Sequence, residues 1–367
     1  MPPKARIAVI GTGWWATYAH IPTLKAHPDA QLVALADVRS EVLSKASEKY
    51  DIGTVYTDFQ EMLANESLDG AVIAVWHAAH YEVARACLER GLHVVLEKPM
   101  VLQAVQARDL CGLAREHRCE IIMGYPWHFL TQTVRAREVV QSGALGQIHY
   151  VSSLFSSSAY DLYRGEDHSD NPEMVAQYPV VGPGDVYRDP ARSGGGQGYL
   201  QVTHSAALMF FVSGLKPVSV IAQMDNLDVP VDVVDAIIVR MDNGALASVS
   251  STGAVRGGNG KLDIQIYCKN GWLDLDYIDC TGTIYHADGS QEKLTPNPDA
   301  GDVNYRDLEG YIYPAHAPVH NLVEVILGQS PNRSPAETGR RTVELLDAAY
   351  RSAAMGGQAI NVASLYD

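Results

Sequence analysis

The chain has 367 residues, with 28 Lys and Arg against 43 Asp and Glu, and therefore a formal net charge of −15. At about 150 residues per domain, this length predicts two domains. The acidic balance argues against a nucleic-acid-binding protein, because neutralising phosphates requires a basic face. The longest apolar stretches, such as residues 70–76, are far shorter than the roughly 20 residues that span a bilayer, so a membrane protein is not expected either.

The N-terminus and the cysteines both predict a cytoplasmic location. The first residues lead directly into an apolar segment, without the pattern of a secretory signal peptide. The five cysteines are scattered and have no CxxC spacing, which favours reduced thiols over disulfides or a zinc site. We therefore expect a cytoplasmic protein that binds no metal.

The first third of the chain alternates short β-branched runs with longer helical patterns, as in a parallel sheet with crossover helices. Strands are predicted at residues 6–10, 32–36, 53–56, 70–75, 93–96 and 120–123. Helices are predicted between them at residues 15–26, 40–49, 59–64, 79–90 and 102–116. This order predicts an α/β domain over residues 1–124, a doubly wound Rossmann-type sheet that binds a nucleotide.

After residue 124 the pattern becomes that of an antiparallel sheet. A helix at 134–142 is followed by strands predicted at 148–157, 218–224, 233–241, 245–251, 262–267, 272–276 and 282–286. Turn pairs such as Asn270-Gly271 separate them and indicate meander hairpins on one open sheet. Helices at 319–327 and 335–355 end the chain and can pack back on the first domain. Residues 125–367 are thus predicted to form an α+β domain for substrate binding and oligomerisation.

Residues 159–193 form a long polar stretch that is rich in Pro and Tyr and has no periodicity. A connection of this length inside a compact domain is usually functional or disordered. Two interpretations stay open, a lid over a site and a contact with another subunit.

A glycine-rich loop lies between the first predicted strand and the first predicted helix. It consists of Gly11, Thr12, Gly13, Trp14, Trp15 and Ala16. Gly11 permits the tight turn, and Gly13 lets the backbone approach a pyrophosphate at the helix N-terminus. The two tryptophans are candidates for the wall of a cofactor cleft, although one of them is expected in the core.

Asp37 lies just past the second predicted strand, where a carboxylate can accept hydrogen bonds from the hydroxyls of an adenosine ribose. It would also repel a 2′-phosphate, so NAD is favoured over NADP. Arg39, two residues on, keeps NADP as an alternative, and Val38 between them is a further cofactor candidate. The competing interpretation is a glycine turn in a sheet that binds no nucleotide.

Glu97-Lys98-Pro99 ends the fifth predicted strand. A Rossmann domain, then this tripeptide, then an antiparallel sheet domain resembles the glucose-fructose oxidoreductase, inositol dehydrogenase and rhizopine catabolism (Gfo/Idh/MocA) family. The likeness covers essentially the whole chain and includes residues 69–75, His80, residues 91–97 and Pro335-Ala336-Glu337. It implies that a nicotinamide cofactor oxidises a secondary hydroxyl of a sugar, an inositol or a related diol. A minority of the family uses the cofactor transiently, in elimination or glycoside hydrolysis.

Lys98 is the first catalytic candidate. It follows the carboxyl end of a strand, where open α/β sheets bind ligands. An amine desolvated beside a nicotinamide can have a lowered pKa and hold or accept the proton of an alcohol. Without the resemblance, an exposed lysine would be the simpler interpretation. By strand position or by resemblance, further cofactor candidates are Val75, Trp76, His77, His80, Glu97 and Tyr125.

The resemblance implies a second signature, a glycine-rich helix start followed by a histidine, which matches residues 193–204. His204 is the candidate general acid or base, since imidazole titrates near neutral pH. Many relatives carry Asp one helical turn before this histidine, where this chain has Leu200. The neighbouring Gln201 is polar but is not a base at neutral pH. Asp185 and Asp189, in the preceding loop, are the candidates for the missing carboxylate.

The remaining substrate candidates are polar and aromatic side chains, which suit a neutral polyhydroxylated molecule. They are His128, Tyr160, Tyr187, Arg188 and His316. His128 is a candidate because the resemblance implies residues facing the nicotinamide or substrate at this point, and a packed aromatic linker is the competing interpretation. The negative net charge argues against an anionic substrate, unless an arginine cluster of Arg164, Arg188 and Arg192 overcomes it. Residues 167–170 and the pair His316 and His320 have spacings seen at metal sites, but no metal is predicted.

Three functions follow from these features. The favoured one is an NAD-dependent dehydrogenase of a sugar, sugar derivative, glycoside or inositol. The alternatives are a lyase or glycosidase that retains its NAD and a non-enzymatic NAD-binding regulator. Both faces of the strand predicted at residues 233–239 carry apolar side chains. An apolar face left exposed on the second sheet can pair subunits, so a homodimer or homotetramer formed through this sheet is predicted.

Overall fold

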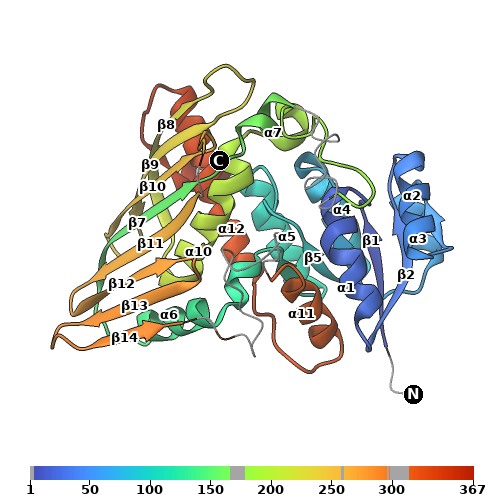
Figure 1. Cartoon of the computed structure of the whole chain (residues 1–367), viewed down its shortest axis with the longest axis horizontal. Helices are drawn as coiled ribbons and strands as arrows, with labels where there is room; N and C mark the ends of the chain where they lie inside the picture. The colour runs from blue at the N-terminus through green and yellow to red at the C-terminus, as the bar shows by residue number, and fades with distance from the viewer. Residues whose placement is uncertain (1–3, 166–177, 258–259, 296, 298–313) are drawn as a thin grey trace.

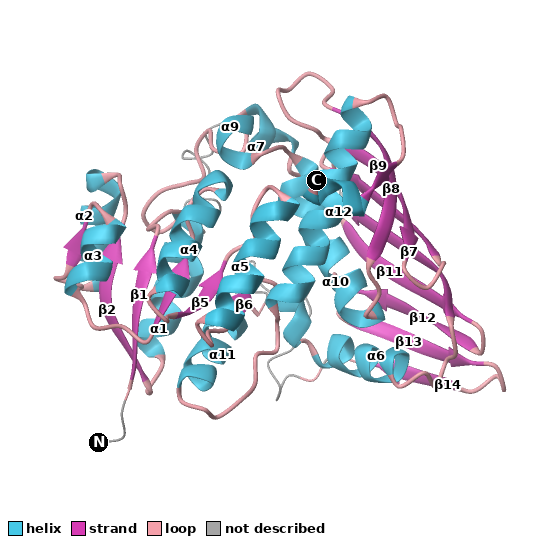
Figure 2. Ribbon diagram, turned by 180° about the vertical axis from the view of Figure 1, so that it is seen from behind, coloured by secondary structure: helices cyan, strands magenta, loops and turns pink. Residues whose placement is uncertain are grey.

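The computed structural model describes residues 4–165, 178–257, 260–295, 297 and 314–367. Two β-sheets lie on opposite sides of the molecule with helices between them, as Figures 1 and 2 show from the front and from behind. Within the described part of the chain, no helix is both long enough and apolar enough to cross a membrane.

The first sheet has six parallel strands in the order β3-β2-β1-β4-β5-β6. Their bounds are β1 (Ala5–Ile10), β2 (Ala30–Ala36), β3 (Val55–Tyr56), β4 (Gly70–Ile73), β5 (His93–Leu96) and β6 (Ile121–Met123). The predicted Rossmann-type sheet is therefore confirmed. The order reverses between β1 and β4, which is the point where sheets of this kind bind ligands.

Helices cover both faces of this sheet. They are α1 (Ile21–Ala26), α2 (Ser40–Tyr50), α3 (Phe59–Asn65), α4 (His80–Glu89) and α5 (Ala104–Glu116). The first predicted helix is divided, because a π-helix, η1 (Ala16–His20), precedes α1. Pro22 in α1 has no N–H group with which to continue the α-helical hydrogen-bond pattern.

The second sheet has nine strands in the order β14-β13-β12-β11-β7-β10-β9-β8-β15. Their bounds are β7 (Ile148–Ser156), β8 (Pro217–Asp225), β9 (Val234–Met241), β10 (Leu246–Thr252), β11 (Lys261–Cys268), β12 (Gly271–Asp276), β13 (Thr281–His286), β14 (Gln291–Leu294) and β15 (Ile360–Asn361). The expectation of simple meander hairpins is wrong at β7, which lies between β10 and β11 and runs parallel to β10. A parallel pair needs a long crossover, and the chain between β7 and β10 supplies it.

The second half of the chain adds further helices, several of which lie between the two sheets (Figure 1). They include α6 (Thr131–Gln141), α7 (Tyr160–Arg164), α9 (Pro190–Ser193), the π-helix η4 (Gly198–Val202), α10 (Thr203–Ser213), α11 (Ala317–Ile326) and α12 (Ala336–Ala354). Every residue of α10 is buried, as expected for a helix that is apolar on all sides. Helix α11 packs on the first sheet through Val319, Leu322 and Val323. The two halves of the chain thus share a core.

Candidate active site

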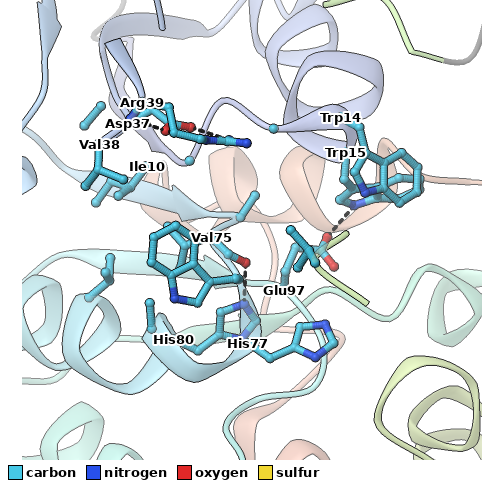
Figure 3. Close-up of a pocket in the computed structure, with 18 of the residues that line it drawn as sticks. Ile10, Trp14, Trp15, Asp37, Val38, Arg39, Val75, His77, His80 and Glu97 are labelled. Carbon is cyan, nitrogen blue, oxygen red and sulfur yellow. Dashed lines mark hydrogen bonds and ion pairs between the residues drawn. The ribbon is translucent and has the colours of Figure 1, made fainter. Parts of the chain in front are cut away.

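A cleft of about 370 Å³ opens at the carboxyl edge of the first sheet (Figure 3). Its walls come from the glycine-rich loop, from the ends of β2, β4 and β5, and from residues 182–187 of the second half. Among its lining residues are Gly11, Gly13, Trp14, Trp15, Asp37, Val38, Arg39, Val75, Trp76, His77, His80, Glu97, Lys98 and Tyr187. The structure thus brings together every predicted cofactor residue except Thr12 and Tyr125.

The glycine-rich loop has the geometry that a dinucleotide phosphate requires. Gly11 has a φ of +91°, and a Cβ at this position would overlap the carbonyl of Ala74. A Cβ at Gly13 would meet only the Arg39 guanidinium, at 3.5 Å, so the backbone there is open to a ligand. Amide N–H groups in the first turn of the helix that follows have no intrahelical acceptor and favour an anion. These residues therefore fit the pyrophosphate of a dinucleotide.

Asp37 is buried and both of its carboxylate oxygens are occupied. Oδ2 accepts hydrogen bonds from the Thr12 amide and from Arg39 Nη2, both at 2.8 Å. Oδ1 accepts from the amide and the Nε of Arg39, at 2.9 and 3.0 Å. Burial acts to raise the pKa of Asp37, but the hydrogen bonds and charge of Arg39 hold it below the usual value. Thr12 of the glycine-rich loop therefore holds the Asp37 carboxylate in place, while the side chain of Arg39 lines the cleft.

The carboxylate of Glu97 lines the cleft and is held against the first helix. Its Oε1 accepts a hydrogen bond from Trp15 Nε1 at 2.7 Å and lies 2.9 Å from His20 Nε2. Burial acts to raise the pKa of Glu97, but the hydrogen bond to His20 and the charge of Lys98 keep it below the usual value. Sequence patterns did not point to His20, because only tertiary packing brings the π-helix η1 to the end of β5.

Lys98 faces a backbone carbonyl of the second half. Its Nζ donates to the oxygen of Leu200 at 3.1 Å. Burial lowers the pKa of Lys98 to about 8, against the opposing charge of Glu97. The side chain of Leu200 packs away from Lys98, in a cluster that contains Tyr163 and Val231. At Leu200, where the family resemblance implies a carboxylate, this chain thus presents a main-chain oxygen.

His204 lies in the first turn of α10 with only 4% of its surface exposed. Its ring packs edge-on against Trp127, with ring centroids 4.9 Å apart, and its Nδ1 has no hydrogen-bond partner among the described residues. Burial, together with the charge of Lys98, holds the pKa of His204 well below its usual value. The imidazole is therefore neutral at neutral pH. His204 interacts with Lys98 electrostatically but is not among the residues that line the cleft.

The described part of the predicted loop covers one side of the cleft. Tyr187 accepts a hydrogen bond from Trp14 Nε1 at 3.2 Å, and its ring centroid lies 5.9 Å from that of His77. Burial raises the pKa of Tyr187 to about 12. His77 Nδ1 lies 2.8 Å from the carbonyl of Ser193, which joins the loop to the end of β4. The metal-like spacing at residues 167–170 lies outside the described residues.

Two predicted site residues at the domain junction are buried beside the cleft. His128 stacks on Phe211 with ring centroids 4.1 Å apart, and its Nδ1 lies 2.9 Å from Ser334 Oγ. The hydroxyl of Tyr125 lies 3.0 Å from Thr203 Oγ1, beneath the first turn of α10. Both rings therefore fill space between α10 and the start of the second half.

Other substrate candidates lie apart from the cleft. The hydroxyl of Tyr160 bonds to Asp228, and Asp185 is exposed and pairs with Arg192 at 3.4 Å. The ring of His316 packs against that of His320, with centroids 5.0 Å apart. The cleft lining does not include Tyr160, Asp185, Arg188, Gln201 or His316.

Two of the three arginines that were expected to form a cluster have carboxylate partners instead. Arg164 pairs with Asp228 at 3.0 Å, and Arg192 pairs with Asp189 at 3.3 Å as well as with Asp185. Carboxylates thus neutralise two of the three arginines that an anionic substrate would need. In the described part of the chain, no group of three or more His, Cys, Asp or Glu side chains is arranged to hold a metal ion.

Comparisons with known proteins agree with this geometry. Residues 5–125 match the family model described as "Oxidoreductase family, NAD-binding Rossmann fold", and residues 133–274 match the GFO/IDH/MocA C-terminal domain. An uncharacterized oxidoreductase of Synechocystis sp. is 25% identical over 362 residues, covering 93% of this chain and 91% of the relative. The D-glucoside 3-dehydrogenase of Escherichia coli is 33% identical over 150 residues, covering 40% of this chain and 42% of that enzyme.

A solved structure extends the likeness to the whole fold. Levoglucosan dehydrogenase, in complex with NADH and levoglucosan, superposes with a TM-score of 0.75 at 18% identity, covering 98% of this chain and 99% of the other. The two matching models together span the cofactor cleft and most of the second sheet. The chain therefore belongs to the GFO/IDH/MocA family of oxidoreductases and has its NAD-binding Rossmann fold.

Proposed function

We propose that this protein is an NAD-dependent dehydrogenase that oxidises a secondary hydroxyl of a neutral sugar, sugar derivative, glycoside or inositol. The observation that carries the proposal is a lysine with a pKa of about 8 in the wall of the cleft that fits the nucleotide, close to a neutral histidine. The names of two relatives, a D-glucoside 3-dehydrogenase and a levoglucosan dehydrogenase, support the substrate class.

In this proposal the two halves of the chain have different tasks. Residues 1–124 hold the nucleotide, with the loop at Gly11 and Gly13 on the pyrophosphate and Asp37 on the adenosine ribose. Residues 125–367 contribute the remaining substrate contacts and the surface for oligomerisation. Bound NAD would supply the acceptor for the hydride that leaves the carbon. NADP is the less favoured cofactor because Asp37 carries a negative charge at the ribose position.

The protein's own groups handle the hydroxyl proton. His204 is neutral and is therefore able to accept a proton from the substrate oxygen as the carbon loses hydride. Lys98 donates a hydrogen bond to the same oxygen and, with its pKa of about 8, is also able to take part in the transfer. The carbonyl of Leu200 orients the Lys98 ammonium, which then aims its other N–H groups into the cleft.

A lyase or glycosidase that retains its NAD is the second candidate. Two observations favour it. The segment at residues 182–187 walls the cleft, which would slow the exchange of a bound dinucleotide. In addition, position 200 lacks the carboxylate that dehydrogenases of the family often carry. A non-enzymatic NAD-binding regulator is the third candidate and has no observation of its own in its favour.

One experiment separates the three functions. The purified protein is incubated with NAD and a panel of pyranosides, glycosides and inositols, and both NADH absorbance and aglycone release are measured. Net NADH with one of the sugars or inositols supports the dehydrogenase. Aglycone release without net NADH, lost when bound NAD is stripped, supports the second candidate. A protein that binds NAD and converts nothing in the panel contradicts both enzymes and leaves the regulator.

We also propose that the chain forms a homodimer or homotetramer through the outer face of the second sheet. Large apolar side chains lie exposed there, including Ile221, Val234, Ile238 and Leu246. Because the chain carries a net charge of −15, an apolar face is where two copies approach with least repulsion. A cytoplasmic location is supported by the cysteines, none of which forms a disulfide in the part of the chain that the structure describes.

A further inference from the structure

One buried carboxylate holds the glycine-rich segment that precedes η4. Asp232 lies in the connection between β8 and β9 and is 4% exposed. Its Oδ1 accepts a hydrogen bond from the Gly196 amide, and its Oδ2 accepts one from the Gly198 amide, both at 2.7 Å. The hydroxyl of Tyr350, from α12, donates to Oδ1 at 2.7 Å. The main-chain oxygen of Asp232 also accepts from the amide of Gln197 at 2.8 Å.

Close packing reinforces these hydrogen bonds. A Cβ at Gly196 would overlap the carbonyl oxygen of Asp232, and a Cβ at Gly195 would overlap the hydroxyl of Tyr350. Only glycine allows the backbone to approach its neighbours so closely. The segment is therefore clamped between the β8–β9 connection and α12.

The clamped segment leads directly into groups that face Lys98. Two residues after Gly198, Leu200 offers its carbonyl to Lys98 Nζ at 3.1 Å. His204 follows at the start of α10. Residues 198–202 form a π-helix, an irregular turn that frequently marks functional sites. The position of this turn decides where the Leu200 carbonyl and the His204 ring lie relative to Lys98.

We propose that Asp232 is a positioning residue for Lys98 and His204, because it binds the Gly196 and Gly198 amides and thereby fixes the π-helix that presents the Leu200 carbonyl. The expected effect of Asp232 on catalysis rests on the proposed dehydrogenase function. The contact with Lys98 itself is testable without any substrate.

A neighbouring carboxyl supports this role. Asp235 lies on the inner face of β9 and is 2% exposed. Burial and the nearby Asp232 carboxylate raise the pKa of Asp235 well above its usual value, which favours the neutral carboxyl. A second negative charge at this position would weaken the arrangement around Asp232 by repulsion. The neutral carboxyl leaves Asp232 as the acceptor for the glycine amides.

The test uses Asp232→Asn in the full-length protein. The amide has one acceptor oxygen and directs an NH₂ group at an N–H donor, so it is unable to hold both glycine amides. The apparent pKa of Lys98 is measured by competitive acetylation and mass spectrometry over a range of pH. Glu97, His77 and His204 face Lys98 and are unchanged in the variant. We expect the pKa of Lys98 to fall by about one unit, since its charged form loses an acceptor.

Turnover and a matched control complete the design. With an active substrate, and at a pH above about 9 where Lys98 is neutral in both proteins, Asp232→Asn should lower kcat by about tenfold or more through the misplaced Lys98 and His204. The KM for NAD should stay unchanged, since the cofactor loop is distant in sequence and separately held. Asp225→Asn, an exposed carboxylate at the end of β8 that accepts from the Leu227 amide, should change neither quantity. An equal pKa shift in Asp225→Asn, or a normal Lys98 pKa in Asp232→Asn, would overturn the proposal.

A milder variant tests the proposal if Asp232→Asn does not fold. Tyr350→Phe removes one donor to Asp232 and keeps both glycine amides, so it should shift the Lys98 pKa in the same direction by a smaller amount. A fall in kcat without any pKa shift in this variant would contradict positioning through Lys98. If the wild-type protein oxidises nothing in the panel, the proposed function fails, while the acetylation experiment still decides whether Asp232 positions Lys98.

Discussion

Burial and the charge of Glu97 act in opposite directions on the pKa of Lys98. Burial lowers its pKa to about 8, and the adjacent Glu97 limits that fall. Glu97 directs its Oε1 at Trp15 and His20, so the carboxylate does not form an ion pair with Lys98. The only acceptor that the structure gives the Lys98 ammonium is the neutral carbonyl of Leu200, among the residues described. A lysine in this setting exchanges its proton near neutral pH.

Replacing Lys98 tests this chemistry directly. Lys98→Ala should lower the rate of substrate oxidation by roughly 10²–10⁴, the usual size of a general acid or base effect, and should preserve NAD binding. In the wild-type protein the oxidation rate should rise with pH through about 8, as Lys98 loses its proton. Lys98→Arg serves as the control, because arginine stays protonated and should abolish this rise. A pH profile of Lys98→Arg that matches the wild type would move the titration to another group.

In the proposed function, the choice between NAD and NADP depends on Asp37 and Arg39, which form an ion pair in the structure. Asp37→Ala removes the repulsion of a 2′-phosphate and frees the Arg39 guanidinium to bind it. We expect the preference for NAD over NADP to fall by about tenfold or more, which corresponds to roughly 1.4 kcal/mol. Fluorescence titration with both dinucleotides measures the ratio. Arg39→Ala should not increase NADP binding, and an unchanged ratio in Asp37→Ala would place the ribose elsewhere.

Two π-helices converge on the end of β5. The first, η1, follows the loop at Gly11 and Gly13 and delivers His20 to Glu97. The second, η4, follows the glycine-rich segment before α10 and delivers the Leu200 carbonyl to Lys98. Both irregular turns thus contact the neighbouring pair Glu97 and Lys98 from opposite halves of the chain. Regular α-helices in their place would rotate these groups away, since each residue turns the helix by a different angle.

Strand β9 carries an inward carboxyl in an otherwise apolar inner face. Asp235 precedes the buried Ile237 and Val239 on the same side of the strand. The buried Tyr163 and the partly buried Tyr350 also face the Asp232 and Asp235 pair. Desolvation raises the pKa of both hydroxyls, so they stay neutral. Ionisation of Asp235 therefore lowers the stability of the folded state.

Stability should depend on pH through Asp235. Its pKa is raised in the folded state, so its favourable contribution is complete below the ordinary Asp value of about 3.9 and is lost as pH rises toward the folded pKa. As pH rises above about 3.9, the free energy of unfolding of the wild type should fall relative to Asp235→Asn, by up to about 1.4 kcal/mol per pH unit, until the folded pKa is passed. Urea unfolding at several pH values measures this. Parallel pH dependences of the two proteins would show that Asp235 is ionised in the fold.

The cleft is complete only when both halves of the chain are folded together. The first half supplies the glycine-rich loop and the strand ends, and the second half supplies residues 182–187 and the Leu200 carbonyl. Helix α11 returns to the first sheet, and Ile122 of β6 pairs with Pro335 before α12. The nine-stranded sheet lies on the side of the molecule opposite the six-stranded sheet (Figure 1). Its outer face is thus available for assembly.

A charge on this outer face should separate the subunits. Ile238 is 54% exposed at the centre of β9, next to β8 and β10. Ile238→Asp would bring like charges together across a symmetric interface, so the molar mass measured by light scattering should fall to that of one chain. Leu227→Asp, an equally exposed change in the β8–β9 connection, is the control and should preserve the oligomer. A wild-type protein that is already monomeric would contradict the proposed assembly.

Local sequence patterns were sufficient to predict the Rossmann sheet and the cofactor side of the site. Strand periodicity and glycine positions are local, and the carboxyl ends of parallel strands share one edge. The sequence therefore predicted that Gly11, Asp37 and Lys98 lie around one cleft, as they do. The same local logic predicted most elements of the second sheet, although β14 is polar and β15 is too short to give a signal.

Long-range partners, in contrast, are determined by packing between distant segments. Periodicity shows that a residue faces inward but does not show what it faces, so it could not identify His20 beside Glu97 or Asp232 beneath the glycine-rich segment. His128 was a substrate candidate by its place after β6, yet the structure stacks it on Phe211. The parallel place of β7 and the main-chain acceptor at Leu200 likewise follow from the tertiary structure, because their partners come from remote parts of the chain.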